Sequence, residues 1–187
     1  GMAGCALGGV PYGVGELVAL AHLGGTVGCL ADVASRRGGA GAVRGLRRRG
    51  LFEGEEAVGG VEAMAAGYAD LLTSQGWGSI CLMGCSSGAI VGVRLADILR
   101  SRGVEVPLLV LVDSGPCVTA AGRWRRAVTG VIKRAARPLG TGGAGYERPS
   151  EVGGHVSRAQ QVLMRLHLDG LHRHRMQPYK GRCRVIP

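Results

Sequence analysis

The sequence predicts an α/β fold with a mostly parallel central sheet and helices on both faces. The runs 17–22 and 107–112 are apolar along nearly their whole length, so each suits a buried strand. Strands that are apolar on both faces and separated by helices are typical of a parallel sheet covered on both sides. Residues 79–91 add a short apolar strand, the pattern G-x-S-x-G and an apolar-periodic helix in direct succession. We therefore expect strands and helices to alternate up to Asp113.

The other expected elements lie around these three segments. Residues 1–15 are Gly-rich and patternless, so we expect a linker or a frayed end there. Residues 16–187 are expected to form one domain, because their length suits a single core. The further elements expected before Asp113 are a helix over 27–36, a weaker strand over 42–46, a helix over 57–73, and a helix over 89–102 that Gly103 ends.

After Asp113 the pattern changes. Residues 114–156 are rich in Gly, Arg and Pro, with only a short helical stretch near 123–136. A second helix is expected over 157–172, and the residues from Pro178 onward are typical of a turn that enters another strand. Helices inserted between two strands of a sheet stand where a lid over an active site would lie. We expect such a lid over about residues 115–176.

The strong positive charge has two interpretations. The net charge is +10, and Lys133 and Lys180 are the only lysines among 23 basic residues. Such a charge could favour nucleic acid, an anionic membrane or an acidic protein. The alternative is that the charge reflects the composition of the genome, since a GC-rich genome encodes many Arg, Gly and Ala residues and few Lys residues. Scattered arginines without interleaved aromatic residues favour the second interpretation, so we expect no nucleic-acid and no membrane partner.

Cysteine and histidine spacing predicts no metal site. The six cysteines show no spacing typical of a disulfide framework. No second pair of metal ligands elsewhere in the sequence would complete a site with Cys81 and Cys85. The run from His167 to His174 is expected to be surface histidines of a basic helix rather than a metal cluster. We find no signal peptide, and Glu16 and His22 interrupt the best apolar run, so we expect a cytoplasmic protein.

Ser86 is the candidate nucleophile. It is the central residue of Gly84-Cys-Ser-Ser-Gly88, and this pattern between a strand and a helix places a serine on a strained turn with its hydroxyl exposed. The glycines are expected because a Cβ at either position would collide with a neighbouring element. The alternative is chance, since a chain with 35 glycines produces such spacings often.

A serine hydroxyl needs a base, a carboxylate and oxyanion donors before it attacks a carbonyl. Asp113 is the candidate acid, because it ends a strand at the sheet edge where ligands bind, although Asp-Ser is also a common turn cap. The backbone N–H groups of Ser87 and Gly24 are the candidate oxyanion donors. His22 is expected to be a structural residue of the glycine loop.

Five segments together resemble the thioesterase domain of non-ribosomal peptide and polyketide synthases, an α/β-hydrolase family. His22-Leu-Gly-Gly-Thr26 resembles its HPxGG loop, and Gly84–Gly88 matches its nucleophile elbow. The other three resemble its YGLxAxGL segment, its LRxxGxxVxxLxLLDS strand and its PYxGR turn; they are Val43–Leu51, Leu99–Ser114 and Pro178–Arg182.

The resemblance implies an activity and a partner. Ser86 would be acylated by a chain carried on the phosphopantetheine of an acyl or peptidyl carrier protein, with no further cofactor, and Asp113 would be the triad acid. Water would then release a free acid, or an internal nucleophile a ring. Leu23 and Arg94 depart from the family, which has Pro and Glu there.

The catalytic histidine of the family lies beyond the strand that the PYxGR turn introduces, so the sequence is expected to be cut short at Pro187. Three hypotheses follow: a thioesterase, a truncated or degenerate domain that binds acyl carrier protein without turnover, and a basic nucleic-acid-binding protein. The last would bind DNA with a steep salt dependence.

Overall fold

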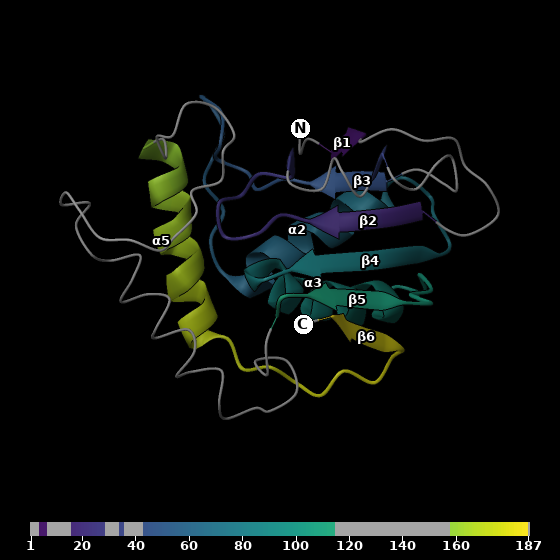
Figure 1. Cartoon of the computed structure of the whole chain (residues 1–187). Helices are drawn as coiled ribbons and strands as arrows, with labels where there is room; N and C mark the ends of the chain where they lie inside the picture. The colour runs from purple at the N-terminus through teal and green to yellow at the C-terminus, as the bar shows by residue number, and fades with distance from the viewer. Residues whose placement is uncertain (1–3, 7–15, 29–33, 36–42, 115–157, 187) are drawn as a thin grey trace.

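A six-stranded sheet organises the molecule, with strand order β1-β3-β2-β4-β5-β6 (Figure 1). The computed structural model describes residues 4–6, 16–28, 34–35, 43–114 and 158–186. Every neighbouring pair of strands is parallel except β1 and β3, which are antiparallel. The strands are β1 (Gly4–Ala6), β2 (Glu16–Leu20), β3 (Val43–Leu46), β4 (Ile80–Cys85), β5 (Leu109–Val112) and β6 (Cys183–Ile186).

Two helices cover one face of the sheet, and a third stands at its edge. Helices α2 (Val61–Thr73) and α3 (Ser87–Ser101) lie side by side behind the strands in Figure 1. Helix α5 (Arg158–Arg173) stands beside the edge where the parallel strands end. Glycines bring it close, because a Cβ on Gly170 would lie 2.3 Å from the Cα of Gly60. In open α/β sheets this edge is where ligands bind.

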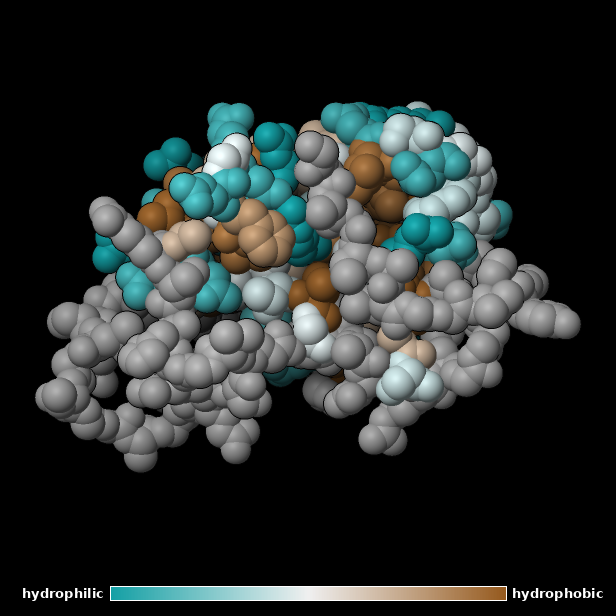
Figure 2. All heavy atoms as spheres, turned by 90° about the horizontal axis from the view of Figure 1, so that it is seen from above, coloured by the Kyte–Doolittle hydropathy of each residue, from teal (hydrophilic) through white to brown (hydrophobic). Residues whose placement is uncertain are grey.

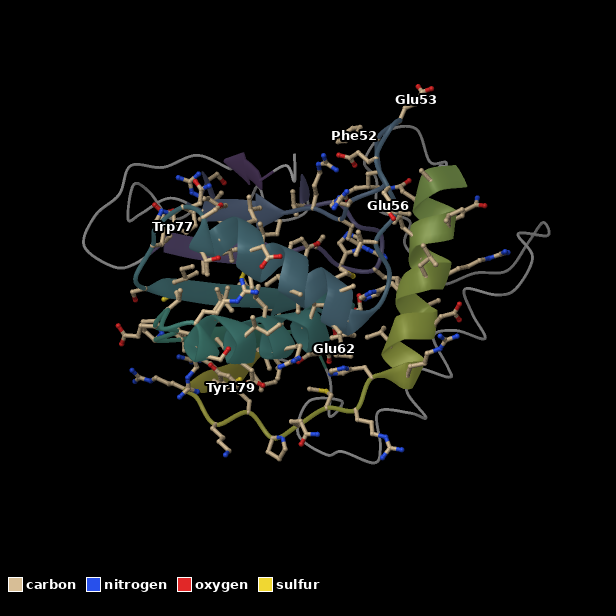
Figure 3. The ribbon with its side chains drawn as sticks, turned by 180° about the vertical axis from the view of Figure 1, so that it is seen from behind. Phe52, Glu53, Glu56, Glu62, Trp77 and Tyr179 are labelled. Carbon is tan, nitrogen blue, oxygen red and sulfur yellow. The ribbon has the colours of Figure 1, made fainter. Side chains whose placement is uncertain are left out.

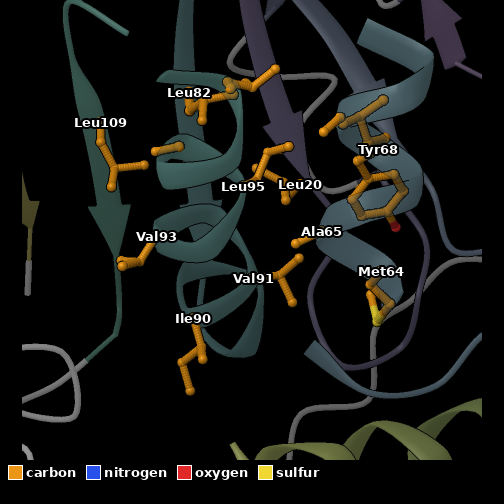
Figure 4. Close-up of a cluster of buried hydrophobic side chains, with 14 of the residues drawn as sticks. Leu20, Met64, Ala65, Tyr68, Leu82, Ile90, Val91, Val93, Leu95 and Leu109 are labelled. Carbon is orange, nitrogen blue, oxygen red and sulfur yellow. The ribbon is translucent and has the colours of Figure 1, made fainter. Parts of the chain in front are cut away.

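The main core lies between the sheet and the helices α2 and α3 (Figure 4). Apolar residues at helical spacing give α2 one buried face, with Tyr68 only 4% exposed. Strands β4 and β5 contribute Leu82, Leu109 and Leu111, each 0% exposed, as expected of central strands. The opposite face of the sheet carries a smaller cluster of buried residues: Ala19, Ala21, Val27, Ala34, Val43 and Met83.

The α/β class and the order of elements are confirmed, with shifted boundaries. Helix α2 begins at Val61 rather than at 57, because Gly60 has φ 84, which no helical residue adopts. Strand β1, in the region expected to be linker, was not predicted; it pairs with β3 through its backbone. The helix expected near 123–136 and most of that over 27–36 lie outside the described residues. So does the expected lid between 115 and 157.

Seen from above, over the β1 side of the sheet, hydrophilic side chains surround smaller groups of apolar ones (Figure 2). Phe52 is the most exposed large apolar residue of the described part, at 63%, and the guanidinium of Arg47 stacks 4.4 Å from the centre of its ring. Among the described residues no helix is long and apolar enough to cross a bilayer.

Glu55 closes the turn that follows β3. Its carboxylate accepts hydrogen bonds from Arg47 Nη1 at 2.7 Å and from the backbone N–H of Gly50 at 3.1 Å. The hydrogen bond from Arg47 is the main cause that lowers the pKa of Glu55 to about 2. The carboxylate therefore holds together the segment that carries the basic residues 47–49.

Replacing Glu55 by Gln is expected to lower Tm at neutral pH, and the difference from wild type should shrink steadily as the pH falls toward 2. An unfolded Glu has a pKa of about 4.3. A folded-state pKa below that value stabilises the fold above about pH 4.3, and this stabilisation is lost as the pH falls toward 2. Thermal unfolding followed by circular dichroism from pH 7 to pH 2.5 measures the effect.

Glu53→Gln is the matched control, because Glu53 is an exposed residue of the same turn (Figure 3). Its Tm should follow that of the wild type at every pH. A Glu55→Gln difference that is the same at pH 7 and pH 2.5 would contradict the electrostatic origin of the effect.

Candidate active site

Ser86 occupies the sharp turn between β4 and α3, as the sequence predicts. Its backbone angles are φ 52 and ψ −121, and its side chain is exposed. The N–H of Ser86 donates to the carbonyl of Val112 at the end of β5, at 2.8 Å, and the N–H of Ala89 donates to the Ser86 carbonyl at 3.0 Å. The turn is therefore held by the neighbouring strand on one side and by the first turn of α3 on the other.

The two glycines of the elbow are required by space. A Cβ on Gly84 would lie 2.6 Å from the Cα of Ala89, inside the first turn of α3. A Cβ on Gly88 would lie 2.6 Å from the carbonyl oxygen of Ala21, just beyond β2. These contacts confirm the expectation that any side chain there would collide with a neighbouring element. They also show that the elbow is packed directly against the end of β2.

Asp113 lies next to the elbow at the same edge of the sheet. Strands β4 and β5 are parallel neighbours in which Cys85 pairs with Val112, so Ser86 and Asp113 each follow a paired residue. Adjacent strands lie about 4.8 Å apart, which brings the two residues side by side. Burial, and then the charge of the nearby Asp113 carboxylate, raise the pKa of the Cys85 thiol in this elbow.

Ser86 and Asp113 share an unusual backbone conformation. Among the described residues they alone combine a side chain with a positive φ, at 52° and 48°. Non-glycine residues in this region store strain, and such residues cluster at active sites. The N–H of Asp113 donates to the carbonyl of Ile186 at 2.9 Å, which fixes it to β6. Two independent strands thus end in strained residues at one point of the sheet edge.

The candidate oxyanion donors differ in their surroundings. Ser87 is the first residue of α3, and N–H groups of a first helical turn have no partner within the helix and favour an anion. The N–H of Gly24, in contrast, donates to Nδ1 of His22 at 3.0 Å. The imidazole of His22 therefore occupies the donor that the sequence assigned to the oxyanion, and His22 is a structural residue of its loop.

The described histidines of the C-terminal region do not form the exposed run that was expected. His167 is only 1% exposed, and burial lowers its pKa to about 3, with a smaller effect from Arg48. The expectation of a surface position is wrong for His167, because its place on α5 turns this side chain into the interior. The side chain of His172 and the whole of His155 lie outside the described residues.

His174 belongs to an ion cluster where α2, α3 and the end of α5 meet. Glu62, at the start of α2, accepts from Nε of Arg94 at 2.6 Å and lies 3.2 Å from Nδ1 of His174 (Figure 3 labels Glu62). A hollow of about 320 Å³ adjoins this cluster, with Asp97 in its lining. Ser86 and Asp113 do not line it, so it is separate from the elbow.

The described residues contain no group of three or more His, Cys, Asp or Glu side chains that could hold a metal ion. Cys81 and Cys85 are partly buried free thiols, and Cys183 is an exposed one. Burial is the main cause that lowers the pKa of both His167 and His174, and none of the ion pairs among the described residues joins either imidazole to Asp113.

Sequence reasoning missed Arg48, which lies within the segment Val43–Leu51 and was given no role. The side chain is 1% exposed and lies beneath the glycine loop, with its aliphatic part against Gly25. Gly25 allows the side chain to approach the loop closely, but a glycine alone does not identify which side chain packs against it. Three consecutive arginines nevertheless suggest a solvated turn, and only the tertiary structure shows which one is enclosed.

Comparison with known proteins agrees with this geometry. A family model described as "Thioesterase domain" matches residues 16–130, more than half of the chain. The dimodular nonribosomal peptide synthase of Bacillus subtilis (strain 168) is 35% identical over 94 residues, which are 50% of this chain but only 4% of that protein.

Solved structures show the same fold at low sequence identity. The NocB thioesterase domain in a covalent complex has a TM-score of 0.61 at 20% identity, over 91% of this chain and 70% of that chain. The RedJ thioesterase of Streptomyces coelicolor has a TM-score of 0.64 at 22% identity, over 88% and 64%. The type II thioesterase BorB has a TM-score of 0.61 at 16% identity, over 97% and 75%. The matched region contains both the elbow and the strand that ends in Asp113, so the chain belongs to the thioesterase domain family and has an α/β-hydrolase fold.

Proposed function

We propose that this domain releases an acyl, polyketide or peptidyl chain from the phosphopantetheine thioester of a carrier protein. The observation that carries the proposal is the pair of strained residues, Ser86 and Asp113, at the ends of the adjacent strands β4 and β5. Family membership supports a thioester substrate, and the nonribosomal peptide synthase relative supports a carrier-bound one. The proposal needs no cofactor, no nucleic acid and no membrane, and places the reaction in the cytoplasm.

In the proposed first step, Oγ of Ser86 attacks the thioester carbonyl carbon. The hydroxyl proton passes to a base, which the resemblance identifies as a histidine that follows β6 in the family, and Asp113 would orient that base. Collapse of the tetrahedral intermediate breaks the carbon–sulfur bond, and the base returns its proton to the departing sulfur, which leaves an acyl group on Ser86 and a thiol on the carrier. Water, or a nucleophile within the chain itself, then attacks the acyl-enzyme and releases an acid or a ring.

The negative oxygen of the tetrahedral intermediate needs N–H donors. Ser87 supplies one from the N-terminus of α3, where the helix dipole also favours negative charge. Gly24 is the proposed second donor, with a condition that the structure adds. Its N–H already donates to Nδ1 of His22, so it becomes available only when that imidazole turns away or is protonated.

Release of a chain from a loaded carrier protein tests the proposal. The domain is incubated with an acyl-phosphopantetheine carrier and, in parallel, with a soluble acyl-pantetheine thioester, and free acid and free thiol are measured by mass spectrometry. We expect both substrates to be cleaved by the wild type, and the Ser86→Ala variant to be inactive. Equal background release by the two proteins would rule the proposal out.

The alternative is a degenerate domain that binds acyl carrier protein without turnover. The His22–Gly24 hydrogen bond favours it, because a donor occupied by a side chain is not ready for catalysis. Binding of loaded carrier, measured by calorimetry, without any Ser86-dependent release would establish this second function.

A further inference from the structure

We propose that Arg48 is a positioning residue that fixes the loop carrying the candidate oxyanion donor. The loop is His22–Thr26, which follows β2. The proposal rests on the function proposed above, since it assigns a role at the same site. It goes beyond the sequence interpretation, which gave Arg48 no role.

The guanidinium of Arg48 joins the loop to the segment that leads into α2. Nη1 donates to the carbonyl of Leu23 at 3.4 Å, and Nη2 donates to the carbonyl of Val58 at 3.5 Å. Both distances are long, but a charged donor strengthens such bonds. The separate nitrogens of the planar fork reach two carbonyls in different directions, whereas an ammonium group offers all its donors from a single nitrogen. Arg48 thereby connects two segments that are far apart in the sequence.

The rest of the residue holds the same loop. The backbone N–H of Arg48 donates to the carbonyl of Gly25 at 3.1 Å. Gly25 has φ 80, and a Cβ there would lie 3.2 Å from Cδ of Arg48, so the side chain packs flat against the loop backbone. The carbonyls of Leu23 and Gly25, on the two sides of Gly24, are therefore both bound by this one residue.

The loop lies directly beside the elbow. Leu20 ends the strand that leads into it and Ala21 follows, and the carbonyl oxygens of both lie against Gly88 in the first turn of α3. A movement of the loop would shift the N–H of Gly24 relative to Ser86. Displacements of about 1 Å at a distance from the reacting atoms cost up to roughly 100-fold in rate. Arg48 therefore acts on the reaction through the loop, without touching the substrate.

Enclosing the charge of Arg48 costs stability, so packing alone does not explain an arginine at this position. None of the ion pairs among the described residues includes it, and its Nε has no partner. Burial, and then the nearby charge of Arg48, lower the pKa of His167 in α5, whose Nδ1 is also without a partner. An unpaired buried charge is unfavourable, and an apolar residue of similar size is often as stable or more so. A residue that served only the fold would be expected to be apolar here.

The test compares Arg48→Met, Arg48→Lys and the control Arg102→Met. Methionine keeps much of the length of the side chain and removes the charge and the donors, whereas lysine keeps the charge but not the fork. Arg102 forms an exposed ion pair with Asp70 at the far end of α3, so its substitution should leave the loop and the reaction unchanged. Hydrogen exchange, Tm and acylation kinetics are measured for all four proteins.

We expect faster amide exchange in the peptide covering 20–27 for Arg48→Met, with an unchanged or higher Tm. The rate of acylation should fall roughly 10- to 100-fold, with KM changing less than about threefold, because a transition-state donor is displaced. Arg48→Lys should recover part of both effects. Arg102→Met should behave as wild type in exchange and in rate.

Three outcomes would overturn the proposal: unchanged exchange in residues 20–27, faster exchange throughout the domain with a lowered Tm, or a raised KM at constant kcat. The exchange measurement does not depend on turnover. If the wild type shows no Ser86-dependent acylation, the proposed function fails, while local exchange around Gly24 still decides whether Arg48 fixes the loop.

Discussion

Replacing Ser86 by alanine is expected to abolish formation of a covalent acyl-enzyme, with a fall in acylation rate of at least about 10³-fold. The reason is that the carbonyl carbon then has no attacking oxygen at the elbow, while the substrate site keeps its shape. Alanine is a small change in volume at an exposed residue, so the fold should be unaffected. Intact-protein mass spectrometry after reaction with an activated ester measures the acylated fraction.

Ser87→Ala is the matched control for this experiment. Its backbone N–H, the candidate oxyanion donor, is retained, and its hydroxyl is buried without a hydrogen-bond partner. The variant should therefore be acylated at nearly the wild-type rate. Loss of acylation in both variants would point to damage of the elbow rather than to loss of the nucleophile.

Cys85 is the residue to which an acyl group could be transferred instead. It precedes Ser86 and is partly buried, and its pKa is raised by burial and by the nearby Asp113 carboxylate. A raised pKa leaves less thiolate, which is the reactive form. Peptide mapping of the adduct therefore should find it on Ser86, and an adduct on Cys85 that persists in Ser86→Ala would contradict the assignment.

The fold was largely predictable because its strands are central and parallel. Strands β2 and β4 have buried residues on both faces, and β5 alternates buried with partly buried ones, so all three are visible as apolar runs, and the elbow fixes the junction of β4 and α3. Strand β1 was not predictable in this way. Its three residues lie in a Gly-rich segment and pair only through backbone groups with β3, which leaves no side-chain pattern to detect.

The parts of the candidate site that belong to recognisable sequence motifs were predictable. Ser86 and Asp113 follow strands that the sequence shows, and the structure adds the strain and the register that place them together. The hydrogen bond from Gly24 to His22 and the enclosure of Arg48 were not predictable. Both depend on contacts between a side chain and a loop backbone, which no local spacing or periodicity records.

Replacing Gly88 by alanine is expected to destabilise the domain by about 3 kcal/mol or more, since overpacking against an immobile neighbour costs roughly 1–3 kcal/mol and sometimes exceeds it. The new Cβ would lie 2.6 Å from the carbonyl oxygen of Ala21 and 3.2 Å from that of Leu20, and both belong to the backbone. Relief of this contact must move α3 away from the end of β2, which also displaces Ser86. Urea unfolding measures the loss as a lower midpoint at a similar slope.

Gly92→Ala, one turn further along the same helix, is the matched comparison. The decisive result is the sign of the change in stability that each variant shows. Its Cβ would meet only the ends of two leucine side chains, Leu109 at 3.6 Å and Leu20 at 3.7 Å, which is ordinary contact. A glycine in the interior of a helix costs about 0.5–1 kcal/mol relative to alanine, so this variant should be stabilised by a similar amount. Two identical substitutions four residues apart in α3 should therefore shift the midpoint in opposite directions. Equal shifts would mean that the elbow is not packed against β2 as the structure shows, and the position of Ser86 beside the glycine loop would then have no support.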